Sequence, residues 1–268
     1  MTLAWRYTRA VLTNPALWFW GVVFMAFWFV LGAYVFSGGL APGHSAESAY
    51  TSAWFAVITL FSLTTLAMSV ASSITYGTSA LAFGFRYTRL SPVRYTSALI
   101  VAAAAMAVLL SLVMVAVVSG LFSTHFGSTM LPANLPAMIG VAVLSGAFMM
   151  GLATTLVLVV INFLGLRHMN FIEFFPLILS YIFGFTQLFL SVPAWVLYLS
   201  PWNDMESLLY QAFSGTPARV VLGTTTSPVL SWPISVGALA LWVAVLVGLA
   251  TVLLGRIRSV SIQEGRQI

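Results

Sequence analysis

Six apolar stretches dominate the sequence, and each is long enough to cross a lipid bilayer as one α-helix. A helix that spans the hydrocarbon core needs about 20 mainly apolar residues. The stretches cover residues 17–36, 53–81, 97–122, 135–164, 171–192 and 233–254. They are continuously apolar, whereas the strands of a membrane barrel alternate apolar and polar residues. We therefore expect an all-α membrane protein with six transmembrane helices in a single domain, residues 1–268.

The composition excludes an ordinary soluble fold. The chain is 61% hydrophobic and only 6% charged, whereas a soluble domain carries about 25% charged residues. So few charges could not cover the surface of a soluble protein of this size. The absence of cysteine also excludes disulfides, thiolate metal sites and a cysteine nucleophile.

The basic residues, all of them arginine, lie mostly on one side of the predicted membrane. The side that holds both chain ends carries nine of them, namely Arg6, Arg9, Arg86, Arg89, Arg94, Arg167, Arg256, Arg258 and Arg266. The other side carries one arginine and three acids, Arg219, Glu47, Asp204 and Glu206. This asymmetry predicts cytoplasmic N- and C-termini in a multi-pass protein of the plasma membrane. It also accounts for the basic net charge without a nucleic-acid partner.

Two segments outside the spans have helical features. Residues 3–16 place Trp5, Arg6 and Arg9 in a short amphipathic pattern, which predicts a helix on the cytoplasmic surface of the lipid. The alternative is a frayed terminus. Between the fifth and sixth spans, prolines and tryptophans bracket a short helix predicted over residues 202–213, with two acids in its first turn. Its markers are Pro193, Trp195, Pro201 and Glu206, and we expect it at the outer interface.

No catalytic or cofactor-binding motif is present. The chain lacks a phosphate-binding G-x-x-x-x-G-K-[ST] loop, an H-E-x-x-H metal motif and a serine nucleophile elbow. We therefore expect a non-enzymatic chain that holds no cofactor of its own. Ion-coupled carriers usually place acids within their helix bundle, and Glu173 is the one candidate within the predicted spans. Glu173 is either a gating charge or an interfacial acid that pairs with Arg167.

Polar side chains form a stripe on each of two spans. The second span carries Ser62, Thr65, Ser69, Ser72 and Tyr76 at helical spacing. The fifth span carries Ser180, Gly184, Gln187 and Ser191 in the same way. These faces either line a substrate path or pack helices together through small residues and hydrogen bonds. Gln187 is the most informative member, because an unpaired buried amide is costly.

The loop between the second and third spans combines arginines with aromatic residues and ends at Ser-Pro. Its candidate contact residues are Arg86, Arg89, Leu90, Ser91, Pro92 and Val93. The positive-inside rule explains the arginines but not their aromatic neighbours. We predict a short cytosolic helix over residues 83–90, ended before Pro92, that docks a cytosolic partner.

Three motifs in this order resemble the transmembrane subunits of ABC-2-type transporters. They are the basic amphipathic segment at Trp5-Arg6-Tyr7-Thr8-Arg9, the arginine-rich stretch that ends in Ser91-Pro92-Val93, and the segment Pro193-Ala194-Trp195 to Glu206-Ser207-Leu208. The resemblance covers essentially the whole chain. Ser200 stands where the family usually has asparagine.

The resemblance implies an ATP-driven exporter. Two copies of the chain, or this chain and a similar permease, would pair in the lipid membrane and dock separate ATP-binding subunits that hold ATP and Mg²⁺. Residues 83–93 would be the coupling helix, and the second and fifth spans would border a path for a lipid, drug or glycolipid-like substrate. An ion-coupled carrier or channel and a non-transporting membrane scaffold are the alternatives.

Overall fold

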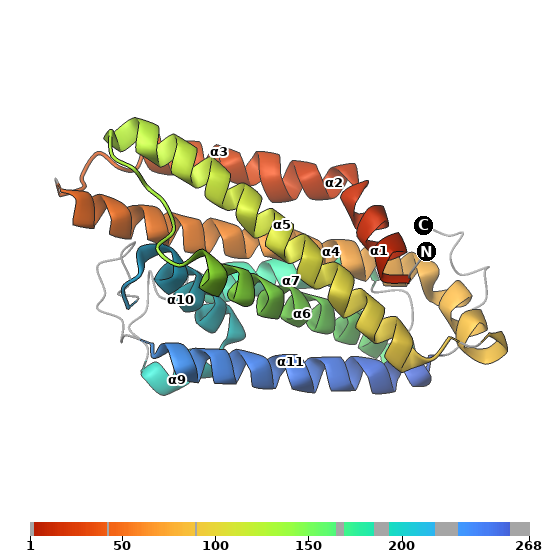
Figure 1. Ribbon diagram of the computed structural model, residues 1–268. Helices are drawn as coiled ribbons and strands as arrows, with labels where there is room; N and C mark the ends of the chain where they lie inside the picture. Colours follow the sequence, from red (N-terminus) through yellow and green to blue (C-terminus); the bar gives the residue numbers. More distant parts are fainter. Residues whose placement is uncertain are drawn as a thin grey trace.

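The computed structural model describes residues 3–41, 43–88, 90–164, 169–184, 193–217 and 230–257, and within these ranges the chain is helical without strands. The helices in chain order are α1 (Leu3–Leu12), α2 (Pro15–Trp18), η1 (Phe19–Val23), α3 (Phe24–Tyr34), α4 (His44–Tyr87), α5 (Pro92–Phe126), α6 (Leu135–Val159), η2 (Val160–Leu164), α7 (Met169–Gly184), α9 (Ala194–Leu199), α10 (Pro201–Ser214) and α11 (Trp232–Gly255). They form one elongated bundle (Figure 1). The all-α prediction is therefore confirmed.

Five helical segments in the described part of the chain are long and apolar enough to cross a membrane. They are Pro15–Tyr34, His44–Thr75, Pro92–Phe126, Leu135–Phe163 and Trp232–Gly255. The chain is therefore a multi-pass membrane protein by length and composition. The remaining predicted span, residues 171–192, is described only as far as Gly184, where α7 ends after 16 residues. Residues 185–192 lie outside the described ranges.

Local signals in the sequence set the helix ends. The Ser91 hydroxyl accepts a hydrogen bond from the Arg94 amide at 3.3 Å, and Pro92 occupies the first turn of α5. Asn134 caps α6 in the same way through the Ala137 amide at 3.0 Å. Both follow the usual N-cap chemistry, in which a side-chain oxygen satisfies a free backbone N–H. Gly127 ends α5 with a φ of 68°, a left-handed conformation that glycine adopts without strain.

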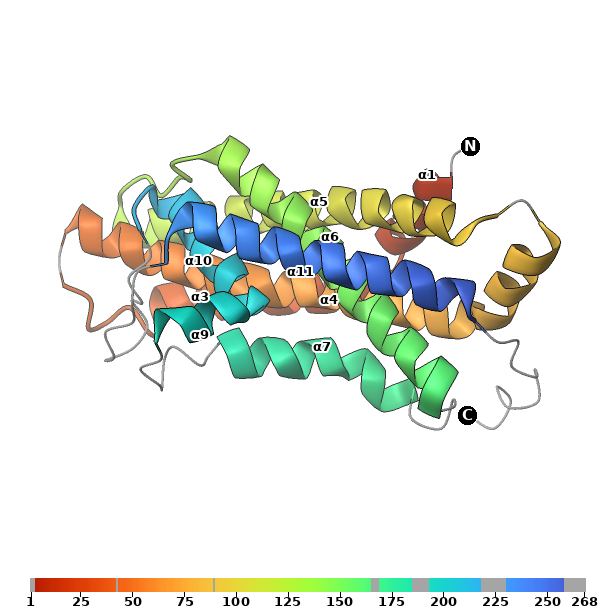
Figure 2. The ribbon, with the colours of Figure 1, turned by 90° about the horizontal axis from the view of Figure 1, so that it is seen from below.

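Helices α4 and α6 form the centre of the bundle. In the apolar stretch of each of these two helices 83% of the residues are buried, whereas in the apolar stretch of α11 only 22% are buried. Helices α3, α5 and α11 lie outside them and expose apolar side chains such as Phe27 and Leu241. Figure 2, seen from below, shows α11 in front of the bundle and α7 along its lower edge. Exposed apolar faces of this kind suit a lipid environment.

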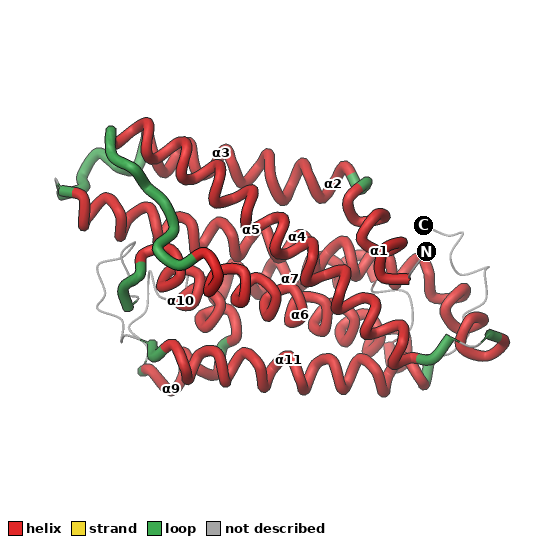
Figure 3. Tube along the Cα trace, viewed as in Figure 1, coloured by secondary structure: helices red, strands yellow, loops and turns green. Residues whose placement is uncertain are grey.

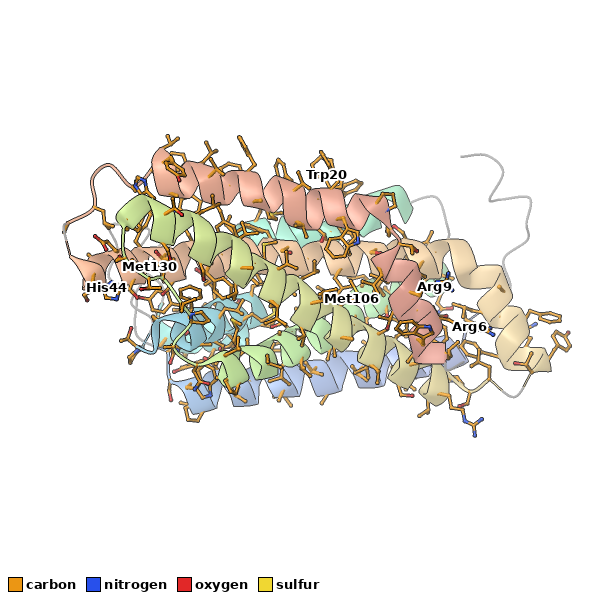
Figure 4. The ribbon with its side chains drawn as sticks, turned by 45° about the horizontal axis from the view of Figure 1, so that its top comes forward. Arg6, Arg9, Trp20, His44, Met106 and Met130 are labelled. Carbon is orange, nitrogen blue, oxygen red and sulfur yellow. The ribbon has the colours of Figure 1, made fainter. Side chains whose placement is uncertain are left out.

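The connections gather at the two ends of the bundle. One end, called the basic end below, holds α1, the connection from α4 to α5 and the last turn of α11 (Figures 1 and 3). The opposite end holds the connections from α3 to α4 and from α5 to α6, together with α9 and α10. In Figure 4, Arg6 and Arg9 lie at the basic end, whereas His44 and Met130 lie at the opposite end.

The prediction of a separate helix over residues 83–90 is wrong. Helix α4 continues without a break from His44 to Tyr87, so residues 83–87 are its last turns. The chain reaches no helix-breaking residue pair before Ser91-Pro92, and the residue that precedes a proline avoids helical conformation. These turns project beyond the rest of the bundle at the right of Figure 1.

Candidate functional site

The exposed surface at the basic end combines positive charge with large apolar side chains. It consists of Trp5, Arg6, Arg9, Phe83, Arg86, Tyr87, Val93 and Arg94, all exposed. We call this set the basic-aromatic surface. Tyr87 is 73% exposed and Val93 is 65% exposed. Arg89, which the sequence also placed here, lies outside the described residues.

A buried aromatic cluster holds the three elements of this surface together. The Tyr95 ring at the start of α5 is almost fully buried. It packs edge-to-face against Tyr7 of α1, with centroids 5.5 Å apart, and against Phe85 of α4, with centroids 5.7 Å apart. Edge-to-face pairs of this kind stabilise packing beyond simple burial. The basic-aromatic surface therefore rests on one rigid junction of α1, α4 and α5.

The connection from α4 to α5 separates residues that support the surface from residues that form it. The Leu90 amide donates to the Thr88 hydroxyl at 3.1 Å, and the Leu90 side chain packs against the core. Ser91 and Pro92 are half-buried at the helix start. Of the predicted contact residues that the structure describes, only Arg86 and Val93 point outward. The residues predicted to contact a partner thus include some that support the basic-aromatic surface and some that form it.

Helix α1 is fixed to the next helix by a short polar junction. Asn14 caps α2 through the Ala16 amide at 3.0 Å, and its side-chain amide donates to the Ser69 hydroxyl of α4 at 3.2 Å. The Trp18 indole N–H donates to the carbonyl of Leu12 at 2.7 Å. These bonds hold the bend between α1 and α2 in one geometry.

The polar stripe predicted on the second span faces the N-terminal helices. The Ser62 hydroxyl donates to the carbonyl oxygen of Gly21 in η1 at 2.6 Å. Gly21 approaches Thr65 so closely that an added Cβ would lie 2.5 Å from its hydroxyl oxygen. With Ser69 bonded to Asn14, three members of the stripe join α4 to α2 and η1, as the packing alternative expects. Ser72 is half-buried, and the Tyr76 side chain is not described.

A second polar contact joins α4, α7 and α10. The Ser180 hydroxyl lies 2.7 Å from the Thr64 hydroxyl and accepts a hydrogen bond from the Trp202 indole N–H at 2.9 Å. Trp202 also stacks on Phe183 and meets Phe148 edge-to-face. Ser180 was singled out by its spacing, whereas Thr64 and Trp202 were not. Gln187, Ser191 and the side chain of Glu173 fall outside the described part.

The helix predicted over residues 202–213 is α10, and it is packed into the end of the bundle. Pro201 opens this helix, while Pro193 and Trp195 precede it and are exposed. Helix α10 lies against α4, α6, α7 and α11. Most of its side chains are buried, including Asp204, which is 0% exposed. The acids were expected near the helix start but not inside the packed bundle.

Burial changes the acidity of both carboxyl groups of α10. It raises the pKa of Asp204 to about 7, and this effect outweighs the lowering by the Ser235 hydroxyl of α11. Burial raises the pKa of Glu206 to about 8. Neither Asp204 oxygen nor Glu206 Oε2 has a hydrogen-bond partner among the described residues. Within the same ranges no cluster of three or more metal-ligating side chains occurs.

No protein-family model matches the chain, and no curated protein matches it at a significant level.

Proposed function

We propose that the chain is the transmembrane subunit of an ATP-driven exporter of the ABC-2 type and that it docks a separate ATP-binding subunit. The basic-aromatic surface carries this proposal. It spans the start of α1, the projecting end of α4 and the start of α5, and the buried Tyr95 cluster fixes these elements to each other. A rigid surface of arginines and aromatic side chains suits a specific protein contact, since such residues dominate binding energy at interfaces.

The topology of the proposal follows the sequence. The basic end would face the cytoplasm of the plasma membrane, with six spans that include α7, and α10 would lie toward the outer side. Two such chains, or this chain and a similar permease, would form the complete transporter. ATP and Mg²⁺ would bind in the partner subunit, so this chain would perform no catalysis itself.

The proposed substrate path runs along the seam between α4 and α7. Thr64 and Ser180 supply hydroxyl groups there, and Phe61 stacks on Tyr181 with ring centroids 4.5 Å apart. An apolar seam with few polar groups favours a hydrophobic or amphipathic substrate, such as a lipid, a drug or a glycolipid-like molecule. Gln187 and Glu173 stay candidates for this path and its inner mouth.

Co-purification tests the proposal. The double variant Arg86→Glu and Val93→Asp changes two outward side chains while leaving Leu90 and the Ser91 cap in place. We expect it to insert in the membrane normally and to lose the ATP-binding subunit. Leu131→Asp is the matched control, because Leu131 is also 65% exposed but lies before α6, at the opposite end. An ATP-binding subunit that stays bound to the double variant would refute the docking surface.

An ion-coupled carrier is the second candidate, and the two buried acids of α10 favour it. Carriers of this class use carboxyl groups within the protein to bind the coupling ion or to relay protons. Purified chain in liposomes without any ATP-binding subunit separates the two functions. Substrate movement driven by a pH gradient alone would support the carrier, whereas movement that requires ATP and the partner would support the exporter.

A further inference from the structure

Asp204 lies at the seam between α10 and α11. Gln211 of α10, two helical turns further along, donates to the carbonyl of Leu230 just before α11, so this face of α10 is turned toward α11. The Ser235 hydroxyl of α11 lies close enough to influence the acidity of Asp204. Asp204 and Ser235 are both 0% exposed, and neither has a hydrogen-bond partner among the described residues.

The helices around Asp204 supply no opposite charge. Helices α6 and α11 contain no titratable residue at all. Two exposed histidines lie at this end, His44 at the start of α4 and His125 at the end of α5, and His125 contacts Ser37 and Tyr34 of the N-terminal segment. The other described titratable groups at this end are acids or tyrosines, namely Glu47 and Tyr50 of α4, Tyr181 of α7, Tyr198 of α9, and Glu206 and Tyr210 of α10. Arg86 and Tyr87 of α4 lie at the basic end. The side chains of Tyr76 and Glu173 and the whole of Arg219 are outside the described residues.

Several of these groups are already engaged elsewhere. The Tyr50 hydroxyl donates to the carbonyl of Gly32 at 2.8 Å, so it is directed toward α3. Glu47 accepts a hydrogen bond from Ser128 at 3.0 Å. The Tyr198 hydroxyl accepts from the Ser231 amide at 2.7 Å. None of the three carries a positive charge, so none supplies a counter-charge to Asp204.

A buried carboxylate without a counter-charge is strongly disfavoured, and such a group takes up a proton instead. A protonated carboxyl gains a donor as well as losing its charge. The O–H of Asp204 can then donate to Ser235 Oγ, which would give both buried groups a partner. A proton is also the cation that needs no additional space between the packed helices.

We propose that Asp204 is a proton-binding site, which holds a proton between its carboxyl group and Ser235 while α10 is packed against α11. This proton site does not depend on whether ATP or an ion gradient drives transport. Docking takes up a proton, because the docked carboxyl has a higher affinity for it than the solvated one. The docked arrangement is therefore favoured at acidic pH, and it weakens as the pH rises from the ordinary range of a carboxyl to about 7.

Infrared spectroscopy tests the site directly, because the C=O stretch of a protonated carboxyl is separate from the carboxylate bands. We expect the full chain in detergent or lipid to show a protonated-carboxyl band that titrates near neutral pH. In a Glu206→Gln background, which removes the other carboxyl of α10 with a raised pKa, Asp204→Asn should remove that band, and Asp204→Glu should keep a titrating band at a shifted frequency. Glu47→Gln is the control, because it makes the same carboxyl-to-amide exchange at a group that is bonded to Ser128 outside α10, and it should leave the band intact.

Two results would overturn the proposal. The first is a band that Asp204→Asn leaves unchanged, which would show that Asp204 is ionised in the folded chain. The second comes from Arg219→Gln. If this change raises the titration midpoint of the Asp204 band, Asp204 is half of an ion pair rather than a proton site. An unchanged midpoint supports the proposal.

Discussion

Helices α5 and α6 approach each other so closely at Gly146 that one added methyl group should destabilise the bundle. A Cβ at Gly146 would lie 2.7 Å from the carbonyl oxygen of Ala103 and 2.7 Å from the Cβ of Ala107. Both distances are shorter than van der Waals contact, and neither neighbour has a flexible side chain that can rotate away. Small residues let membrane helices pack closely. Gly146→Ala should therefore force α5 and α6 apart.

The change in the free energy of unfolding caused by Gly146→Ala is the difference between two opposing contributions. Overpacking a closely packed site costs about 1–3 kcal/mol. Replacing glycine by alanine within a helix stabilises it by about 0.8–1.0 kcal/mol. Gly140 of the same helix supplies the control, because a Cβ there would meet no atom within 4 Å. Gly140→Ala gains the helical contribution alone, so the two variants should differ by about 1–3 kcal/mol.

Thermal unfolding in detergent measures this difference. For chains near this size, 1 kcal/mol shifts the midpoint by about 2–4 °C. Gly140→Ala should unfold at or above the wild-type temperature, and Gly146→Ala should unfold several degrees below Gly140→Ala. Equal midpoints for the two variants would refute the close contact between α5 and α6.

Three further predictions concern single groups. Ser91→Ala removes the N-cap of α5 at the Arg94 amide and should cost about 1 kcal/mol, read as faster amide exchange in the first turn of α5. Trp202→Phe keeps an aromatic ring but removes the donor to Ser180, and it should lower stability by about 0.5–1.5 kcal/mol in thermal unfolding. Burial raises the pKa of Glu206 to about 8, so the folded chain binds more protons and loses stability as the pH rises from the ordinary range of glutamate to about 8. Glu206→Gln should flatten that slope between the ordinary range of glutamate and about pH 8, and an unchanged slope would contradict it.

The sequence predicted the membrane helices well because length and hydropathy depend on local residues alone. The predicted span 233–254 differs from α11 by one residue at each end. The prediction was poorer for α4, which begins at His44 rather than at residue 53. The extra turns are polar, and tertiary contacts such as the Tyr50 bond to Gly32 support them. Contacts between distant segments cannot be read from apolar periodicity.

Helical spacing identified which side chains share a face but not which helix they meet. Ser62 and Ser69 do lie on one face of α4, and that face meets η1 and Asn14. The contact toward α7 uses Thr64, which a period of 3.6 residues assigns to another face. The sequence could not tell these faces apart, because both are buried and both carry hydroxyl groups. Only the positions of the neighbouring helices separate a packing face from a candidate path.

The acids of α10 change the argument about ion coupling. From the sequence, the scarcity of acids within the spans argued against a carrier, and Asp204 and Glu206 were assigned to an external segment. That segment instead packs between the long helices, so an acid outside every span is still shielded from water. Hydropathy detects segments that cross the membrane, but it is insensitive to a short helix that folds back into the bundle. The number of acids within the spans is therefore no argument against proton binding here, and the titration of Asp204 is what decides it.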